Sequence, residues 1–242
     1  MKELKIASKE HEVELASVKA LYPAVKLFVF DFREKFNFIP GQFVVLEMKD
    51  EKGNNVKRSY SISSSPGKKN IELVVNIIPG GKMTQLLDKL MVGDKIKLLG
   101  PHGRFGSEIR SFEKDLMFIA AGTGITPVRS LINSLIKNKS KSKISLLYGF
   151  RHEMNFIFQE ELEDLRDENT NFTLIPTVSQ PVNAKHWGGQ IGRVTDWLNK
   201  NISSKNSGQE FYICGLGPMV KDTKKVLLEN GVKAEQIHVE VW

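Results

Sequence analysis

The pattern of strands and helices changes near residue 110, and this change limits the fold more than any other feature of the chain. Before it, six short strand-like segments alternate with Pro-, Gly- and Asn-containing turns at intervals of about 8–12 residues. This punctuation predicts an antiparallel β-barrel or sandwich. One helix interrupts the strands over residues 83–90, because Leu86, Leu87 and Leu90 share a helical face.

After residue 110 apolar strands alternate with amphipathic helices such as 127–137 and 219–229. Continuous apolar strands joined by helices predict a parallel sheet covered on both faces, with a ligand crevice at the carboxyl ends of its strands. We therefore expect two domains, a β-barrel over residues 1–109 and an α/β domain over 110–242, joined at Arg110–Lys114. Five parallel strands are expected, at 116–121, 144–149, 172–178, 211–214 and 237–242.

Composition excludes several classes of protein. The single cysteine, Cys214, cannot form an internal disulfide or supply the four thiolates of an iron–sulfur cluster. The sequence has no apolar run of about 18 residues and begins with a charged segment, so neither a membrane span nor a secretory signal is expected. These features favour a cytoplasmic protein, and no metal site is expected.

Basic residues are in excess, with a net charge of +7, of which +5 falls in residues 1–108 and +2 in residues 109–242. A basic surface favours acidic partners. The basic residues are not interleaved with aromatic ones and no nucleic-acid motif is present, which argues against nucleic acid as the partner.

The first chemical motif is Arg-Ser-Tyr-Ser at residues 58–61. Alternation on a strand places Arg58 and Tyr60 on one side and Ser61 on the other. The planar guanidinium of Arg58 suits a phosphate, because it donates two parallel hydrogen bonds. Twenty or so residues later, Gly81 permits close backbone approach at a helix N-terminus, a place that attracts anions. The anion would meet Lys82, Met83 and Thr84 there.

A second segment that could bind a phosphate, Ala-Ala-Gly-Thr-Gly-Ile-Thr-Pro, lies at the end of the strand expected at 116–121. Gly122 and Gly124 allow the turn, Thr126 is expected to cap the helix, and Pro127 suits its first position. The amides from Thr123 to Thr126 would then face a diphosphate. Pro127 replaces the third glycine of the common dinucleotide fingerprint, so this is a different version of that turn.

Taken in order, these segments resemble the ferredoxin–NADP⁺ reductase superfamily. The resemblance also includes Gly-Pro-His-Gly-Arg-Phe at 100–105, Tyr-Ile-Cys-Gly-Leu-Gly-Pro-Met at 212–219 and the terminal His-Val-Glu-Val-Trp. The resemblance covers roughly residues 55–242. Residues 1–50 match the family only in their pattern of short strands. It implies FAD in the barrel, on Arg58, Ser59, Tyr60, Ser61, Ser64, Gly81, Lys82, Met83, Thr84 and Trp242. It implies NADH or NADPH in the second domain, on Gly122, Thr123, Gly124, Thr126, Pro127, Arg151, Ser179, Gly215 and Met219.

The resemblance further implies hydride transfer between the nicotinamide and FAD. Its catalytic residues would be Ser61 near the reacting flavin nitrogen, Glu240 beside the nicotinamide, Cys214 packed near the reacting carbon, and Trp242. The terminal Trp242 would stack on the flavin until the coenzyme displaces it. Plastid-type relatives end in Tyr at this position, so the larger ring puts coenzyme selectivity and turnover in question.

The sequence favours NADH weakly over NADPH. Gln180 stands where NADP⁺-specific relatives carry an Arg beside Ser179, and Gly192 and Val194 align with their Lys and Tyr. A 2′-phosphate needs such groups to offset its desolvation. Nearby residues that could replace them are Lys185, His186, Arg193 and Arg151.

Three functions remain open from the sequence. The first is an FAD reductase that exchanges electrons with an acidic ferredoxin, flavodoxin or oxygenase component. The second is the electron-transfer subunit of a larger complex, although such subunits usually carry a four-cysteine motif that this sequence lacks. The third is a nucleotide-binding module without activity, which the presence of Ser61, Cys214 and Glu240 disfavours.

Overall fold

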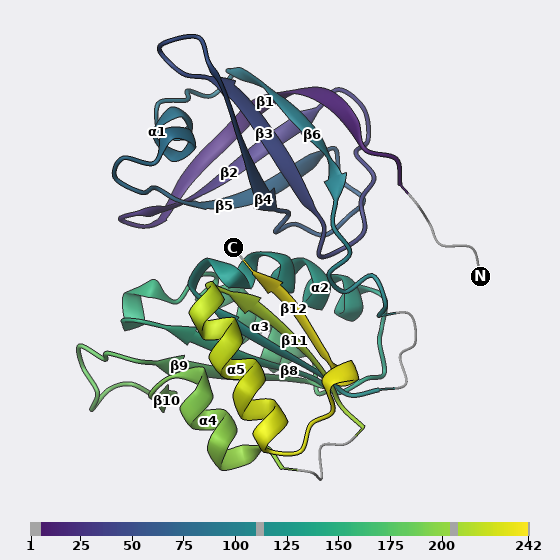
Figure 1. Cartoon of the computed structure of the whole chain (residues 1–242), viewed down its shortest axis with the longest axis vertical. Coiled ribbons are helices and arrows are strands. Elements are labelled where there is room, and N and C mark those ends of the chain that lie inside the picture. Colours follow the sequence, from purple (N-terminus) through teal and green to yellow (C-terminus); the bar gives the residue numbers. More distant parts are fainter. Residues whose placement is uncertain (1–5, 110–113, 204–207, 242) are drawn as a thin grey trace. The chain divides into compact units, whose positions relative to one another are not determined.

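The computed structural model describes residues 6–109, 114–203 and 208–241 (Figure 1). The described residues form two compact units. The first contains those up to Ser107 together with Arg129–Ser134, and the second contains Glu108–Val128 and those from Leu135 onward. Residues 110–113 of the expected seam lie outside the described residues, and the boundary at 109/110 stays a prediction.

The first unit is a six-stranded antiparallel sheet that closes on itself. Its strand order is β4-β3-β6-β1-β2-β5, and a bridge between Ile62, just after β4, and Leu73 in β5 joins the two end strands. The expected barrel is therefore present. Its strands are β1 (Lys9–Tyr22), β2 (Val25–Phe32), β3 (Phe43–Lys49), β4 (Asn55–Ser61), β5 (Asn70–Asn76) and β6 (Lys95–His102).

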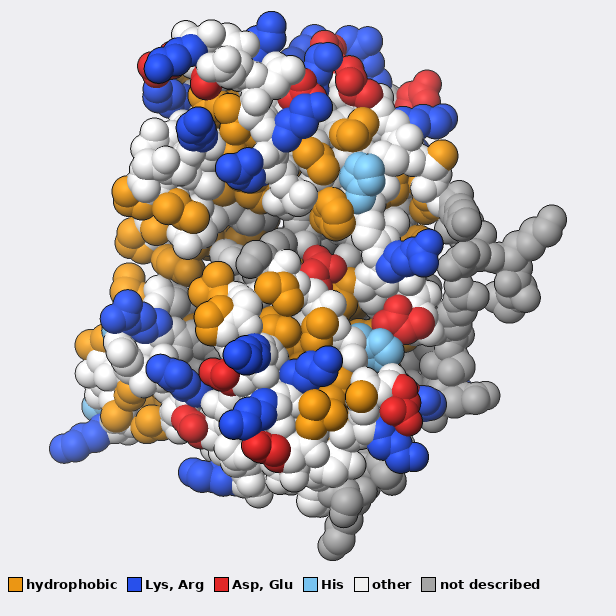
Figure 2. Space-filling model, viewed as in Figure 1, with side chains coloured by type: hydrophobic (Ala, Val, Ile, Leu, Met, Phe, Trp, Pro, Cys, Tyr) orange, Lys and Arg blue, Asp and Glu red, His pale blue; other side chains and the backbone are white. Residues whose placement is uncertain are grey.

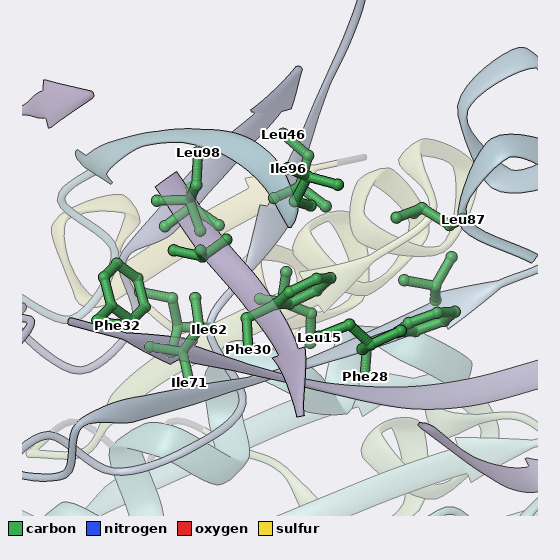
Figure 3. Close-up of a cluster of buried hydrophobic side chains, with 14 of the residues drawn as sticks. Leu15, Phe28, Phe30, Phe32, Leu46, Ile62, Ile71, Leu87, Ile96 and Leu98 are labelled. Atoms are coloured by element: carbon green, nitrogen blue, oxygen red, sulfur yellow. The ribbon is translucent and has the colours of Figure 1, made fainter. Parts of the chain in front are cut away.

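Alternating side chains fill this barrel (Figure 3). On β2, Phe28, Phe30 and Phe32 point inward, and each is at most 6% exposed. The helix α1 (Lys82–Asp88) adds Met83 and Leu87 to the same core. The helix predicted at 83–90 is thus present, although it begins one residue earlier and ends two residues earlier.

The second unit is a parallel sheet in the order β10-β9-β8-β7-β11-β12. Successive strands run outward from β7 in one direction through β8, β9 and β10, and in the other through β11 and β12. The chain therefore changes direction between β7 and β11, where open α/β sheets bind ligands. The strands are β7 (Leu116–Ala121), β8 (Ile144–Phe150), β9 (Phe172–Val178), β10 (Gln190–Ile191), β11 (Glu210–Gly215) and β12 (Ile237–Val241).

The prediction of five parallel strands was wrong by one. The additional strand, β10, consists of two exposed residues that pair with Thr177 and Val178 at the end of β9. Such a short edge strand has no apolar run, so its sequence gives no periodic pattern. The five longer strands lie within a residue or two of the predicted ranges.

Helices flank the sheet because its central strands are apolar on both faces. The helices α4 (Val194–Asn201) and α5 (Gly217–Glu229) bury Val194, Leu198 and Leu227 in one core with strand residues. The other helices are α2 (Ile125–Lys137), which continues a short 3₁₀ turn at Gly122–Gly124, and α3 (Gln159–Glu168). Among the described helices, none has the length and apolar character needed to cross a membrane.

Candidate functional site

Two glycine-containing loops meet at the point where the sheet of the second unit changes direction. A Cβ atom added to Gly124, in the loop after β7, would lie 2.3 Å from the carbonyl oxygen of Cys214 at the end of β11. Only glycine lets these backbones approach so closely. The structure therefore brings together Gly-Thr-Gly-Ile-Thr-Pro and Cys-Gly-Leu-Gly-Pro-Met, which are about 90 residues apart in the sequence.

The first of these loops begins its helical turn earlier than the sequence suggested. Gly122 has a φ of +53° and opens a 3₁₀ turn, and the Ile125 N–H bonds to its carbonyl oxygen. Thr126 is therefore already inside α2, where its hydroxyl donates to the Thr123 carbonyl oxygen over 2.6 Å. The prediction of Thr126 as N-cap and Pro127 as first helical residue was wrong. The amides at the start of the turn are those of Gly122, Thr123 and Gly124.

Cys214 is 0% exposed and lies opposite Glu240 in the pairing of β11 with β12. Burial, and then the charge of Glu240, raises the pKa of the Cys214 thiol well above its ordinary value. The thiol is therefore neutral near pH 7, which suits packing and does not suit a nucleophile. At the next residue, a Cβ on Gly215 would lie 3.2 Å from the sulfur of Met219. Trp242 lies outside the described residues.

Arg151 and Ser179 come together at the carboxyl ends of β8 and β9. The Nε of Arg151 donates to Oε1 of Gln180 over 2.8 Å, and the Ser179 N–H donates to the Phe150 carbonyl oxygen over 2.9 Å. A guanidinium held through Nε keeps its two terminal nitrogens together on one edge. Gln180, which lacks the charge of the Arg found in NADP⁺-specific relatives, thus orients a different arginine.

In the first unit, α1 packs beside β4, so the Arg-Ser-Tyr-Ser strand and the Gly81 helix are neighbours. Arg58 and Ser59 are exposed on this strand, whereas Ser61 is 2% exposed at its end. Burial raises the pKa of Tyr60 to about 12, against the opposing charge of Arg58. The Tyr60 phenol therefore keeps its proton at neutral pH and remains a hydrogen-bond donor.

The turn before α1 is ordered by Thr84. Its hydroxyl oxygen accepts the Ile78 N–H over 3.2 Å and lies 3.1 Å from the Gly81 carbonyl oxygen. A Cβ on Gly81 would lie 2.5 Å from that hydroxyl, so the turn requires glycine. Lys82 is exposed at the first position of the helix. The chemistry of this turn fits an anion held by backbone amides and a lysine.

Ser64 lies three residues after the end of β4 and is buried. Its hydroxyl oxygen accepts the Glu72 N–H over 3.1 Å, and its carbonyl oxygen accepts the Ser130 hydroxyl over 2.7 Å. Arg129, which sequence reasoning missed, forms an ion pair with Glu72 and donates to the Ser63 hydroxyl and carbonyl oxygens, all within the first unit. The Arg-Ser pair after Gly-Thr-Gly-Ile-Thr-Pro was visible in the sequence, but these partners, some 60 residues away, were not.

The residues present fit the two expected cofactors. For FAD, the first unit offers a strand arginine beside a protonated tyrosine and a glycine turn at a helix N-terminus. For the nicotinamide coenzyme, the second unit offers a glycine turn at the topological switch point, and a Cβ on Gly122 would meet no atom within 4 Å. The side of Gly122 where a Cβ would lie is thus open, as close approach of a phosphate requires.

Comparison with known proteins gives the same assignment for each unit. The oxidoreductase FAD-binding domain family matches residues 12–106, and the oxidoreductase NAD-binding domain family matches residues 118–225. The chain is 31% identical to ferredoxin–NADP reductase B of Sorangium cellulosum, over 97% of this chain and 98% of that protein. It is 29% identical to the reductase component of a phenol 2-monooxygenase from a Pseudomonas species, and it covers 62% of that longer relative.

Among solved structures, a ferredoxin NADP⁺ reductase from Neisseria gonorrhoeae with bound FAD and NADP has a similar fold. The TM-score is 0.83 at 25% sequence identity, and the match covers 98% of this chain and 99% of that one. The similarity thus extends over both units and over the full length of two family members. We conclude that this chain belongs to the ferredoxin–NADP reductase family and is an FAD-dependent NAD(P)H oxidoreductase.

Proposed function

We propose that this protein takes a hydride from NADH or NADPH onto FAD and passes single electrons to an acidic redox protein. The partner would be a ferredoxin, a flavodoxin or an oxygenase component. The observation that carries the proposal is the close packing of Gly124 on the Cys214 carbonyl, because it brings two glycine loops together where the sheet of the second unit changes direction. The single cysteine also favours a cytoplasmic location.

FAD, when bound, supplies the ability to accept two electrons together and release them singly. The remaining roles belong to side chains of this chain. Arg58 and the Gly81 turn would hold the phosphates, with Tyr60 donating a hydrogen bond. Ser61 would hydrogen-bond near the reacting flavin nitrogen.

In the second unit, Glu240 would bind the nicotinamide carboxamide or pass a proton, and Cys214 would pack against the reacting carbon. Trp242 would occupy the nicotinamide site until the coenzyme arrives. These roles rest on the resemblance and, for Cys214 and Glu240, on their strand pairing and the burial of Cys214. Each side chain acts by binding, orienting or excluding water, and no covalent step on the protein is required.

The choice of coenzyme depends on Arg151 and Gln180. The oriented guanidinium of Arg151 is a fixed cation at the carboxyl end of β8, which supports acceptance of a 2′-phosphate without the missing arginine. We therefore propose that NADPH is used as well as NADH. The same geometry gives a direct test through the Arg151→Ala variant.

The experiment combines flavin release from the purified protein with steady-state reduction of a dye by each coenzyme. We expect one FAD per chain and activity with both coenzymes. The Arg151→Ala variant should raise KM for NADPH by roughly tenfold to a hundredfold, because a charge-assisted bond contributes roughly 1.5–3 kcal/mol, and should leave KM for NADH nearly unchanged. FMN in place of FAD, or equal effects on both coenzymes, would refute the corresponding part of the proposal.

A second candidate function is electron transfer within a larger assembly. One relative, from Actinobacillus succinogenes, is named as a component of a Na⁺-translocating NADH-quinone reductase, and this chain covers 54% of it. Because this chain has one cysteine, such an assembly would have to supply its own metal clusters. Stable co-purification with a second protein chain would favour this function over that of a free-standing reductase.

A further inference from the structure

Tyr148 lies in the middle of the parallel sheet and reaches the coenzyme turn. Its side chain is 0% exposed, and its hydroxyl donates a hydrogen bond to the Gly122 carbonyl oxygen over 3.0 Å. Strand pairing places Tyr148 opposite Ala120, so the ring extends along the sheet toward the loop that follows β7. The one polar atom of this buried side chain therefore ends at the first residue of the turn.

The Gly122 carbonyl oxygen accepts two hydrogen bonds. One comes from the Tyr148 hydroxyl and the other from the Ile125 N–H. A carbonyl oxygen has two lone pairs, so the peptide that follows Gly122 is held in one orientation. Gly122 at φ +53° followed by a 3₁₀ turn is a left-handed residue before right-handed ones, an arrangement that makes successive amides converge on an anion.

The turn is thus fixed at two points by different means. Gly124 sets its position by contact with the Cys214 carbonyl, and Tyr148 sets the rotation of the Gly122 peptide. The tyrosine ring is itself held edge-on by Phe150 and Phe156, whose ring centroids lie 5.3 and 5.6 Å away. These contacts keep the hydroxyl aimed at the turn.

We infer that Tyr148 is a positioning residue for the diphosphate of the nicotinamide coenzyme. It acts through the Gly122 peptide and does not touch the coenzyme. Without the hydroxyl, the peptide has one hydrogen bond fewer and rotates more freely, so the amides of Gly122, Thr123 and Gly124 converge less often. This inference rests on the proposed use of NAD(P)H and adds a residue outside the glycine loop to that site.

The test compares ligands that differ only in the diphosphate. Competitive inhibition constants against NADH are measured for ADP and for adenosine, with wild type and the Tyr148→Phe variant. We expect inhibition by ADP to weaken about fivefold to tenfold, the effect of losing one hydrogen bond, and inhibition by adenosine to stay within about twofold. KM for NADH should rise by a similar factor at nearly constant kcat, and the FAD content should not change.

Tyr212→Phe is the matched control. Tyr212 is the other deeply buried tyrosine of this sheet, 2% exposed, with its hydroxyl bonded to Glu108 and its ring stacked on His238 at 4.6 Å. The Tyr212→Phe variant loses a buried hydroxyl, which should lower thermal stability without changing the inhibition constant of ADP or of adenosine. This separates a general packing effect from positioning of the diphosphate.

Equal weakening of ADP and adenosine by Tyr148→Phe would overturn the inference, because it would indicate a structural role alone. Unchanged inhibition by both ligands in a folded variant would overturn it as well. If wild type neither oxidises NADH nor binds ADP, the proposed function itself fails, and this result is recognisable before any variant is made.

Discussion

At the scale of single residues, Arg58 is proposed to hold the flavin phosphates together with the turn at Gly81. It is exposed on β4, and its Nη1 donates to the Lys57 carbonyl oxygen over 2.7 Å. The Arg58→Ala variant should lose FAD, because two charge-assisted hydrogen bonds contribute roughly 1.5–3 kcal/mol each. The measurement is the ratio of flavin absorbance to protein after gel filtration.

Arg33→Ala is the control for this change. Arg33 is an exposed arginine of the same unit, and it forms an ion pair with Glu12 at 2.9 Å. Its removal takes away the same charge without touching the β4–α1 region, so FAD content should stay at the wild-type ratio. Full occupancy in Arg58→Ala would show that the phosphates bind elsewhere.

At the scale of elements, the first residues of β11 and β12 make a charged network. Glu210 receives a hydrogen bond from His238 Nε2 at 2.8 Å and pairs with Lys114, while His238 Nδ1 lies 3.2 Å from Glu108. Burial alone would raise the pKa of Glu210, but the hydrogen bonds from Lys114 and His238 outweigh burial and lower it below 4.5. The folded state therefore favours the ionised carboxylate, and this stabilisation is present above pH 4.5 and lost as the pH falls through the lowered pKa.

Glu210→Gln should lower Tm by about 2–4 °C at pH 7, roughly 1 kcal/mol, with a difference that shrinks in acid.

Thermal melts of both proteins between pH 3 and pH 8 check this prediction. Glu12→Gln removes a carboxylate from an exposed ion pair, and such pairs contribute little, so its melts should follow wild type at every pH. A Tm difference for Glu210→Gln that is constant with pH would mean that ionisation of Glu210 is not the source of the stabilisation.

At the scale of the whole molecule, the net charge is expected to favour encounters with the proposed acidic electron acceptor. The chain carries +7, and Lys and Arg side chains are spread over the face drawn in Figure 2 with acidic side chains among them. An excess of this kind attracts an acidic protein over distances that salt shortens to about 10 Å at 0.1 M. With an acidic ferredoxin as acceptor, the second-order rate of reduction should fall about tenfold between roughly 10 mM and 300 mM salt. A small neutral dye is the control, since its reduction rate should change little with salt. A rate of ferredoxin reduction that does not depend on salt concentration would contradict electrostatic attraction.

The sequence by itself determined the order and type of nearly all elements, because hydrophobic periodicity and turn chemistry are local. Residues 116–121 are all apolar and too few for a typical helix, which favours a buried strand, and Pro79, Gly80 and Gly81 favour a turn. The glycine motifs likewise indicated phosphate sites, since close backbone approach to phosphate favours glycine, and the family resemblance then implied FAD and a nicotinamide coenzyme. The family assignment followed from these local patterns and agrees with its relatives.

The tertiary structure decided what depends on strand register and on contacts between distant residues. It placed Gly124 on Cys214, Tyr148 on Gly122 and Arg151 on Gln180, and it paired the two-residue β10 with β9. It also moved the start of the helical conformation to Gly122, before the expected N-cap Thr126, where the 3₁₀ turn contacts β7, β8 and β11. No local pattern contains such pairings, since each joins residues whose distance is set only when the sheet has formed.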